Sequence, residues 1–156
     1  MKEFPKHFGL AEKYKLPMYL HNRNTGNDFF EIVGAHRGSF SNAIVHSFTG
    51  TEEELHKSLQ LDLHVGVNGC SLKTAENMKV AASIPLDRLM LETDAPYCEI
   101  RNTHASAPMV QTKFTSVKHE KFKNGVMVKS RNEPCTIIQV LEVMAKLKNI
   151  PEETLA

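Results

Sequence analysis

The chain has 156 residues, 41% of them hydrophobic, which is enough for one domain with a buried core. Its formal net charge of +1 excludes binding to nucleic acid or membranes through an overall excess of positive charge. No apolar stretch is long enough to span a membrane, and the first residues lack the apolar segment of a signal peptide, so no membrane partner is expected.

Helix and strand patterns alternate along the first 93 residues. Apolar residues at helical spacing predict helices over residues 3–15, 27–36, 51–61 and 74–83. Short apolar runs predict strands over residues 17–21, 42–46, 62–67 and 89–93. Such alternation requires right-handed crossovers, so it predicts an α/β fold with a parallel sheet, either a small open sheet or half a barrel. A last helix is expected over residues 134–148.

Thr51 and Glu54 stand at the start of the third predicted helix with the spacing of a capping box. In that arrangement each residue satisfies a backbone N–H of the other. The acidic residues around them are therefore expected to mark a helix start, where negative charge is favourable, and not a catalytic cluster.

Residues 95–132 show no periodicity, and an irregular loop of this length is unusual and often functional. Between residues 101 and 131 there are seven Lys or Arg and one acid, a local charge of +6. Phe114 and Phe122 lie among them. This mixture suits phosphate contacts with occasional base stacking, although most charge runs are solvated surface.

Three of the predicted strands have a residue that can bind a metal at their carboxyl ends. His21 and His46 are the last residues of their strands, and Asp94 directly follows another. The carboxyl ends of parallel strands meet at one edge of a sheet or barrel. A single His there is more often a hydrogen-bonded structural residue, and Asp94 before Ala95-Pro96 could equally cap a turn. Together the three favour a divalent metal site with imidazole and carboxylate ligands.

Glu92 and Arg23 flank these candidate ligands. Glu92 lies two residues before Asp94, so both carboxylates point to the same side of the strand. It would contact a metal ligand or the substrate, or form a structural salt bridge, and the sequence leaves both alternatives open. Arg23, two residues after His21, suits a phosphate at the same edge unless it is a solvated loop residue.

Four short blocks carry most of this chemistry. They are PMYLHNR at residues 17–23, HSFTG at 46–50, LETDAPY at 91–97 and RNEP at 131–134. In order and spacing they resemble the TatD family of metal-dependent deoxyribonucleases, in its eukaryotic form. The resemblance covers nearly the whole chain.

The resemblance implies a TIM-type (β/α) barrel of the amidohydrolase kind that hydrolyses DNA phosphodiester bonds with metal-activated water. It implies two divalent metal ions in the intact site, as Mg²⁺, Mn²⁺ or Zn²⁺, and DNA as the partner. His21 and His46 would bind one ion, and Asp94 would bind the other or accept a proton from the reacting water. Arg131 and Asn132 would contact the phosphate, or cap the last helix.

The sequence also departs from the family, whose members begin with a His-x-His pair on the first strand and carry a bridging Glu on the fourth. Neither feature is present here. The predicted strands correspond to the family's fifth to eighth, so residues 1–156 are expected to form a single partial barrel domain, the C-terminal half of a TatD-like domain. The exposed sheet edges of half a barrel would permit self-association.

Two other functions therefore stay open. One is a catalytically deficient fragment that binds metal or DNA without the missing His-x-His and Glu ligands. The other is an amidohydrolase-type activity on a small phosphate-free substrate, against which the basic loop argues.

The cysteines indicate in which cellular compartment the protein is found. Cys70, Cys98 and Cys135 include no CxxC pair, which fits reduced thiols better than a disulfide framework or a zinc knuckle. We expect an intracellular protein, with the nucleus favoured over the cytoplasm.

Overall fold

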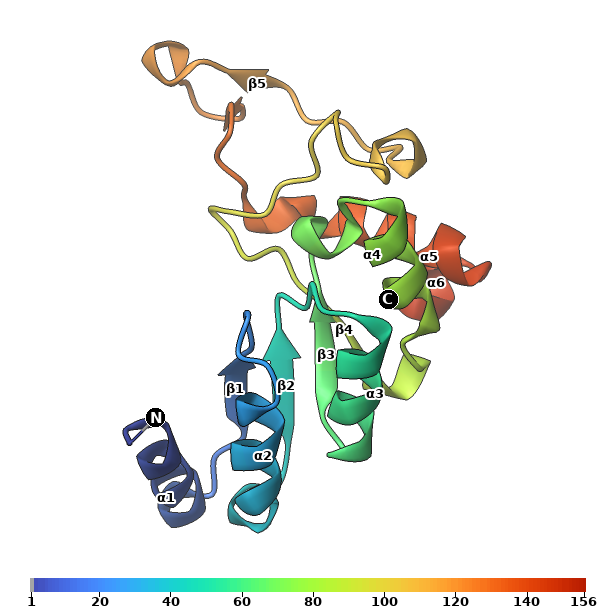
Figure 1. The fold of residues 1–156 in the computed structure, drawn as a ribbon. Coiled ribbons are helices and arrows are strands. Elements are labelled where there is room, and N and C mark those ends of the chain that lie inside the picture. Colours follow the sequence, from blue (N-terminus) through green and yellow to red (C-terminus); the bar gives the residue numbers. More distant parts are fainter. Residues whose placement is uncertain (1) are drawn as a thin grey trace.

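A parallel sheet organises the chain in the computed structural model, which describes residues 2–156. Its four strands neighbour one another in chain order: β1 (Met18–His21), β2 (Ala43–His46), β3 (His64–Val67) and β4 (Leu89–Leu91). The helices that alternate with them are α1 (Phe4–Tyr14), α2 (Asp28–Ala35), α3 (Glu52–Gln60) and α4 (Ala75–Ser83). The predicted α/β fold with a parallel sheet is confirmed (Figure 1).

Polar side chains begin two of these helices. The backbone N–H of Glu54 donates to the Thr51 hydroxyl at 3.2 Å, and the N–H of Thr51 donates to the Glu54 carboxylate at 2.8 Å. This is the predicted capping box. Thr74 caps α4 with its hydroxyl alone, accepting from the Asn77 N–H at 3.1 Å. Both caps satisfy N–H groups that the first helical turn leaves unpaired.

One face of the sheet is apolar and covered. Leu20, Val45 and Val65 are paired neighbours in the register, so their side chains share this face, and all three are buried. They belong to one core with residues of α2 and α3, among them Val33 and Leu55. Burial of this face accounts for the attachment of the helices to the sheet.

The opposite face mixes polar and apolar side chains and is more open. It carries the side chains that alternate with the buried ones, including Tyr19, His21, His46 and Met90. Tyr19 is 67% exposed and Met90 is 45% exposed, although both lie on strands. The two candidate histidine ligands therefore lie on the face that the helices leave uncovered.

The segment after β4 differs from the prediction in detail. β4 ends at Leu91 and not at residue 93, because the backbone turns at Asp94 with a left-handed φ of +55°. The region predicted as irregular contains a small parallel pair, β5 (Ser116–Val117) and β6 (Met127–Val128). Residues 95–132, hereafter the basic loop, project from the sheet in Figure 1.

Two helices complete the described chain. α5 (Ile137–Lys148) begins three residues later than predicted, because Pro134–Thr136 form a 3₁₀ turn, and α6 (Glu152–Leu155) follows it. No helix within residues 2–156 has the length and apolar character needed to cross a membrane.

The basic loop is attached to α5 through Glu142, a buried carboxylate. Glu142 accepts from the backbone N–H of Gln111 at 2.7 Å and of Thr112 at 2.9 Å, and from the Thr112 hydroxyl. Burial alone would raise the pKa of Glu142, but these hydrogen bonds hold it below its ordinary value. The loop is thus fixed where it passes α5.

Leu63→Ala tests the covered face. Leu63 has 0% of its surface exposed, so the substitution should lower the free energy of unfolding by about 2–5 kcal/mol through lost burial and a cavity. Leu10→Ala, at a position 54% exposed on α1, is the matched control and should change it by less than about 0.5 kcal/mol. Urea unfolding followed by circular dichroism measures both, and equal losses would contradict this packing.

Candidate metal centre

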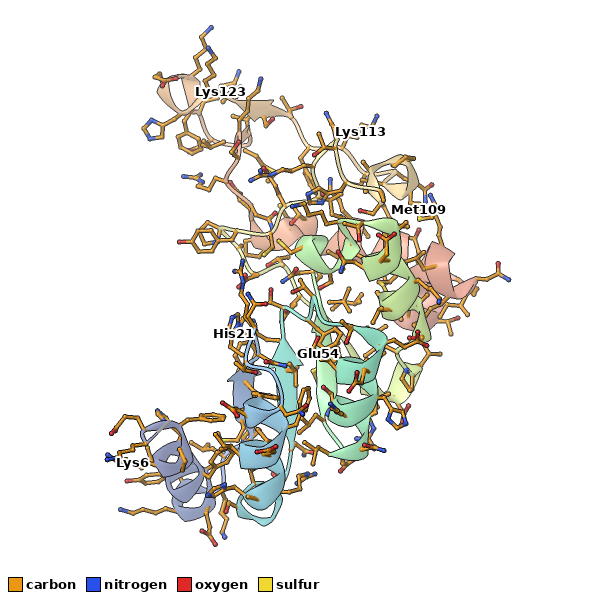
Figure 2. The ribbon with its side chains drawn as sticks, in the orientation of Figure 1. Lys6, His21, Glu54, Met109, Lys113 and Lys123 are labelled. Carbon is orange, nitrogen blue, oxygen red and sulfur yellow. The ribbon has the colours of Figure 1, made fainter. Side chains whose placement is uncertain are left out.

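The two predicted histidine ligands meet at the carboxyl ends of β1 and β2. His21 and His46 are paired in the sheet register, and His21 Nδ1 lies 2.9 Å from His46 Nε2. Figure 2 labels His21 at this end of the sheet. The two rings are hydrogen-bonded to each other here, and imidazole nitrogens are donors that Zn²⁺ and related divalent ions accept. This pair fits one metal ion as two of its ligands.

Glu92 faces the other nitrogen of the His46 ring. His46 Nδ1 is buried without a hydrogen-bond partner among residues 2–156, and Glu92 Oε1 lies 3.9 Å from it. A carboxylate in this position favours the proton on Nδ1, so that Nε2 carries a lone pair. Here Nε2 lies at hydrogen-bond distance from His21 Nδ1, and a bound metal would replace that contact. The surroundings of His46 thus agree with a ligand role.

Glu92 itself joins several strands. Its carboxylate accepts from the Tyr19 hydroxyl at 3.0 Å, from Asn68 Nδ2 at 3.3 Å and from the backbone N–H of Ser47. No Lys or Arg of the described residues pairs with it. Of the two alternatives for Glu92, the contact with a candidate ligand agrees with the structure, and a structural ion pair with a Lys or Arg does not.

Gly66 makes room for this carboxylate. A Cβ built at Gly66 would lie 2.8 Å from Glu92 Oε2, closer than such atoms approach. Since Gly66 lies on β3, between the strands that carry His46 and Met90, any larger side chain there would displace Glu92 from His46.

Asp94 does not join the histidine pair as a third ligand. Its carboxylate accepts from the Cys98 thiol at 3.2 Å. Burial, together with the neighbouring Cys70 and Asp94, raises the pKa of the Cys98 thiol, so the thiol keeps its proton. Nowhere in residues 2–156 do three or more His, Cys, Asp or Glu side chains form a potential metal cluster. The role of Asp94 at a second ion, or towards the reacting water, stays a prediction.

The three predicted substrate contacts lie in different surroundings. Arg23 is exposed after β1, and its side chain makes no hydrogen bond or ion pair with the part of the chain that is described. Arg131 is exposed, 3.4 Å from Glu133 and above the Phe122 ring. Asn132 is buried. Its Nδ2 donates to the carbonyls of Thr93 at 3.0 Å and Tyr97 at 2.7 Å.

These contacts favour a positioning role for Asn132. Both Nδ2 protons are used by the turn that contains Asp94, and Oδ1 accepts from the Thr136 hydroxyl at 2.6 Å. Asn132 therefore ties the Asp94 turn to the start of the last helices. A direct phosphate contact by its amide would have to break one of these bonds.

Asn68 and Tyr19 belong to the site but were not singled out from the sequence. Asn68 is buried directly after β3, with Nδ2 donating to the Ser47 hydroxyl at 2.9 Å and to Glu92. Its position directly after a strand is the signal that identified Asp94. Tyr19, two residues before His21, shares its side of β1, and the period of two was the available signal.

Known proteins resemble the chain over its full length. The sequence profile described as TatD related DNase matches residues 1–156. "Deoxyribonuclease Tat-D" of Schizosaccharomyces pombe is 46% identical over 156 residues, an alignment that covers 98% of this chain and 50% of the relative. The chain thus spans about half the length of that protein.

Two solved structures show the same fold. One, described as a hydrolase TatD family protein from Entamoeba histolytica, has a TM-score of 0.93 and 34% identity, covering 99% of this chain and 52% of its own. The other, described as an uncharacterized amidohydrolase from Saccharomyces cerevisiae, has a TM-score of 0.87 and 33% identity, covering 97% and 55%. The predicted partial barrel of the amidohydrolase kind is confirmed.

Tyr19 offers a test of the hydrogen bond to Glu92. Burial, and then the negative charge of Glu92, raise the pKa of Tyr19 to about 12. The raised pKa means that the interaction stabilises the fold fully below the ordinary phenol pKa of about 10, and that this contribution is lost as the pH rises towards 12.

The measurement is the tyrosinate absorbance of the wild type minus that of Tyr19→Phe, followed from pH 8 upward. This difference isolates Tyr19 and should have its midpoint near 12, and Glu92→Gln should shift the midpoint to lower pH. Circular dichroism checks that the chain stays folded. A midpoint near 10 in the wild type would contradict the hydrogen bond.

Proposed function

The chain belongs to the TatD related DNase family, and on this premise we propose that residues 1–156 act as one partial barrel domain in the metal-dependent hydrolysis of DNA phosphodiester bonds. The observation that carries the proposal is the approach of His21 Nδ1 to His46 Nε2 within 2.9 Å at neighbouring strand ends. The Glu92 carboxylate behind His46 supports it, because a metal-binding imidazole usually has such a partner.

The residues would divide the work as follows. Divalent metal ions, two in the complete family site and Mg²⁺, Mn²⁺ or Zn²⁺ in kind, would supply an activated water and offset phosphate charge. His21 and His46 would hold one ion, and Asp94 would hold the other or accept a proton from the water. The exposed guanidinium groups of Arg23 and Arg131 would contact phosphate oxygens, while Asn132 positions the Asp94 turn.

A second function is favoured by one observation. Within residues 2–156 only two metal-binding side chains converge, and a catalytic zinc site usually has three protein ligands. Binding of metal or DNA without cleavage is therefore the alternative. For either function we propose a nuclear location, which imaging of the tagged chain in cells would test.

The first test compares histidine variants. His21→Ala and His46→Ala should each reduce cleavage of a labelled DNA oligonucleotide in Mn²⁺ to the level seen with EDTA, since each removes one metal-binding nitrogen. His56→Ala is the matched control, because His56 is exposed on α3, and it should leave cleavage unchanged.

Calorimetric titration with Zn²⁺ separates the two functions. Loss of Zn²⁺ binding in both histidine variants, with no cleavage by the wild type, supports the binding function. Cleavage that survives both substitutions would show that the metal site is elsewhere.

We also propose self-association through the open face and edges of the sheet. β1 and β4 are edge strands within residues 2–156, and they expose Tyr19 and Met90. Sedimentation velocity should show association that increases with concentration and is weakened by Met90→Lys. Leu86→Lys, at an exposed position before β4, should have no effect. A wild type that stays monomeric at all concentrations would contradict this proposal.

A further inference from the structure

We infer that the basic loop holds a single strand of DNA along two adjoining hollows, with Phe114 as the stacking surface between them, and directs that strand to Asp94. The inference rests on the proposed function, since it assigns the residues that would position the DNA of that reaction. It concerns residues outside the histidine pair.

Two hollows lie side by side on the loop. The first has a volume of about 680 Å³ and is lined by Arg101, Lys113, Lys129 and Gln139, among others. The second has a volume of about 640 Å³ and is lined by residues that include Pro96, Phe122 and Arg131. Phe114, Met127 and Asn132 line both hollows. The two hollows therefore adjoin at these three residues, and together they are called the path below.

Acids pair with the two arginines of this path, Arg101 with Glu99 at 3.3 Å and Arg131 with Glu133 at 3.4 Å, but not with the lysines. The five lysines of the loop are all exposed, and none forms an ion pair in the described structure; they are Lys113, Lys118, Lys121, Lys123 and Lys129. Figure 2 shows Lys113 and Lys123 on the projecting loop, beyond the end of the sheet where His21 lies. Ammonium groups without acidic partners attract the phosphates of a nucleic acid strand.

Aromatic rings accompany these lysines. Phe114 is 36% exposed and Phe122 is 52% exposed, and the Arg131 guanidinium lies 5.7 Å from the centre of the Phe122 ring. Flat aromatic and guanidinium surfaces stack on unpaired bases. A duplex keeps its base faces stacked inside the helix, so these surfaces favour a single strand.

The path leads to the candidate site. Ala95 and Pro96, which follow Asp94 directly, line the second hollow. The backbone N–H of Asn132 donates to the Pro96 carbonyl at 2.9 Å, in addition to its side-chain bonds to the same turn. A strand in the second hollow therefore lies against the turn that places Asp94.

The path is also held in place before DNA arrives. Gln139 Nε2 donates to the Thr112 carbonyl at 2.9 Å, and Glu142 holds the backbone of Gln111 and Thr112. These bonds from α5 fix the chain immediately before Lys113 and Phe114. Preformed binding surfaces lose less conformational entropy on binding.

Fluorescence anisotropy with a labelled 20-nucleotide single strand, in EDTA, tests the path without cleavage. Phe114→Leu keeps an apolar side chain but removes the ring, and it should weaken binding about tenfold. Lys113→Ala with Lys129→Ala should weaken binding and reduce the slope of log affinity against log salt by about 1.4, or about 0.7 for each lost phosphate contact.

The matched control is Lys13→Ala with Lys79→Ala, two exposed lysines on α1 and α4. It should change neither affinity nor slope, and circular dichroism confirms the fold of every variant. Unchanged binding in both loop variants would overturn the path. The path would also be overturned if duplex DNA or RNA of the same sequence bound more tightly than the single strand, and if Phe114→Leu left that binding unchanged.

The binding assay fails separately from the proposed hydrolysis. If the chain binds DNA through the loop but does not cleave it, the path is supported and the nuclease proposal is contradicted. If the chain cleaves DNA and both loop variants have the KM of the wild type, the nuclease proposal is supported and the path is contradicted.

Discussion

The position of the Glu92 carboxylate is the constraint on which the candidate site depends. It lies just beyond the last strand of the sheet, yet it bonds to the Tyr19 hydroxyl on the first strand and faces His46 on the second. It reaches them because Gly66 on the third strand has no side chain. One half-buried acid thereby links all four strands, and its charge is distributed over donors that are themselves held by the sheet.

Much of the fold follows from local sequence signals. The strands ending at His21 and His46 and the cap at Thr51 were predictable because apolar runs and caps act over a few residues. The β5–β6 pair was not, since each strand has two residues and the pairing depends on how α5 holds the loop. The late start of α5 reflects the 3₁₀ turn at Pro134, which helical periodicity does not distinguish from an α-helix.

The candidate site was predictable only where a residue type has a specific chemical use, such as an imidazole that can bind a metal. His21 and His46 were found because imidazoles at strand ends are conspicuous, and the register then brings them together. Asn68 was missed because an amide after a strand has no single meaning, and its bonds to Ser47 and Glu92 join segments far apart in the chain. The burial of Asn132 was equally inaccessible, because it arises from the turn that folds over it.

Asn132 also has an evolutionary consequence. Its bonds to Thr93, Pro96 and Tyr97 close the base of the loop, so residues 98–131 leave and return at a fixed point. Because the cost of closing a longer loop grows only slowly with its length, insertions and deletions within this segment need not move Asp94. The loop can therefore change length and composition as a replaceable module. Under the function proposed above, the preference for one nucleic acid over another would diverge while the Asp94 turn stays in place.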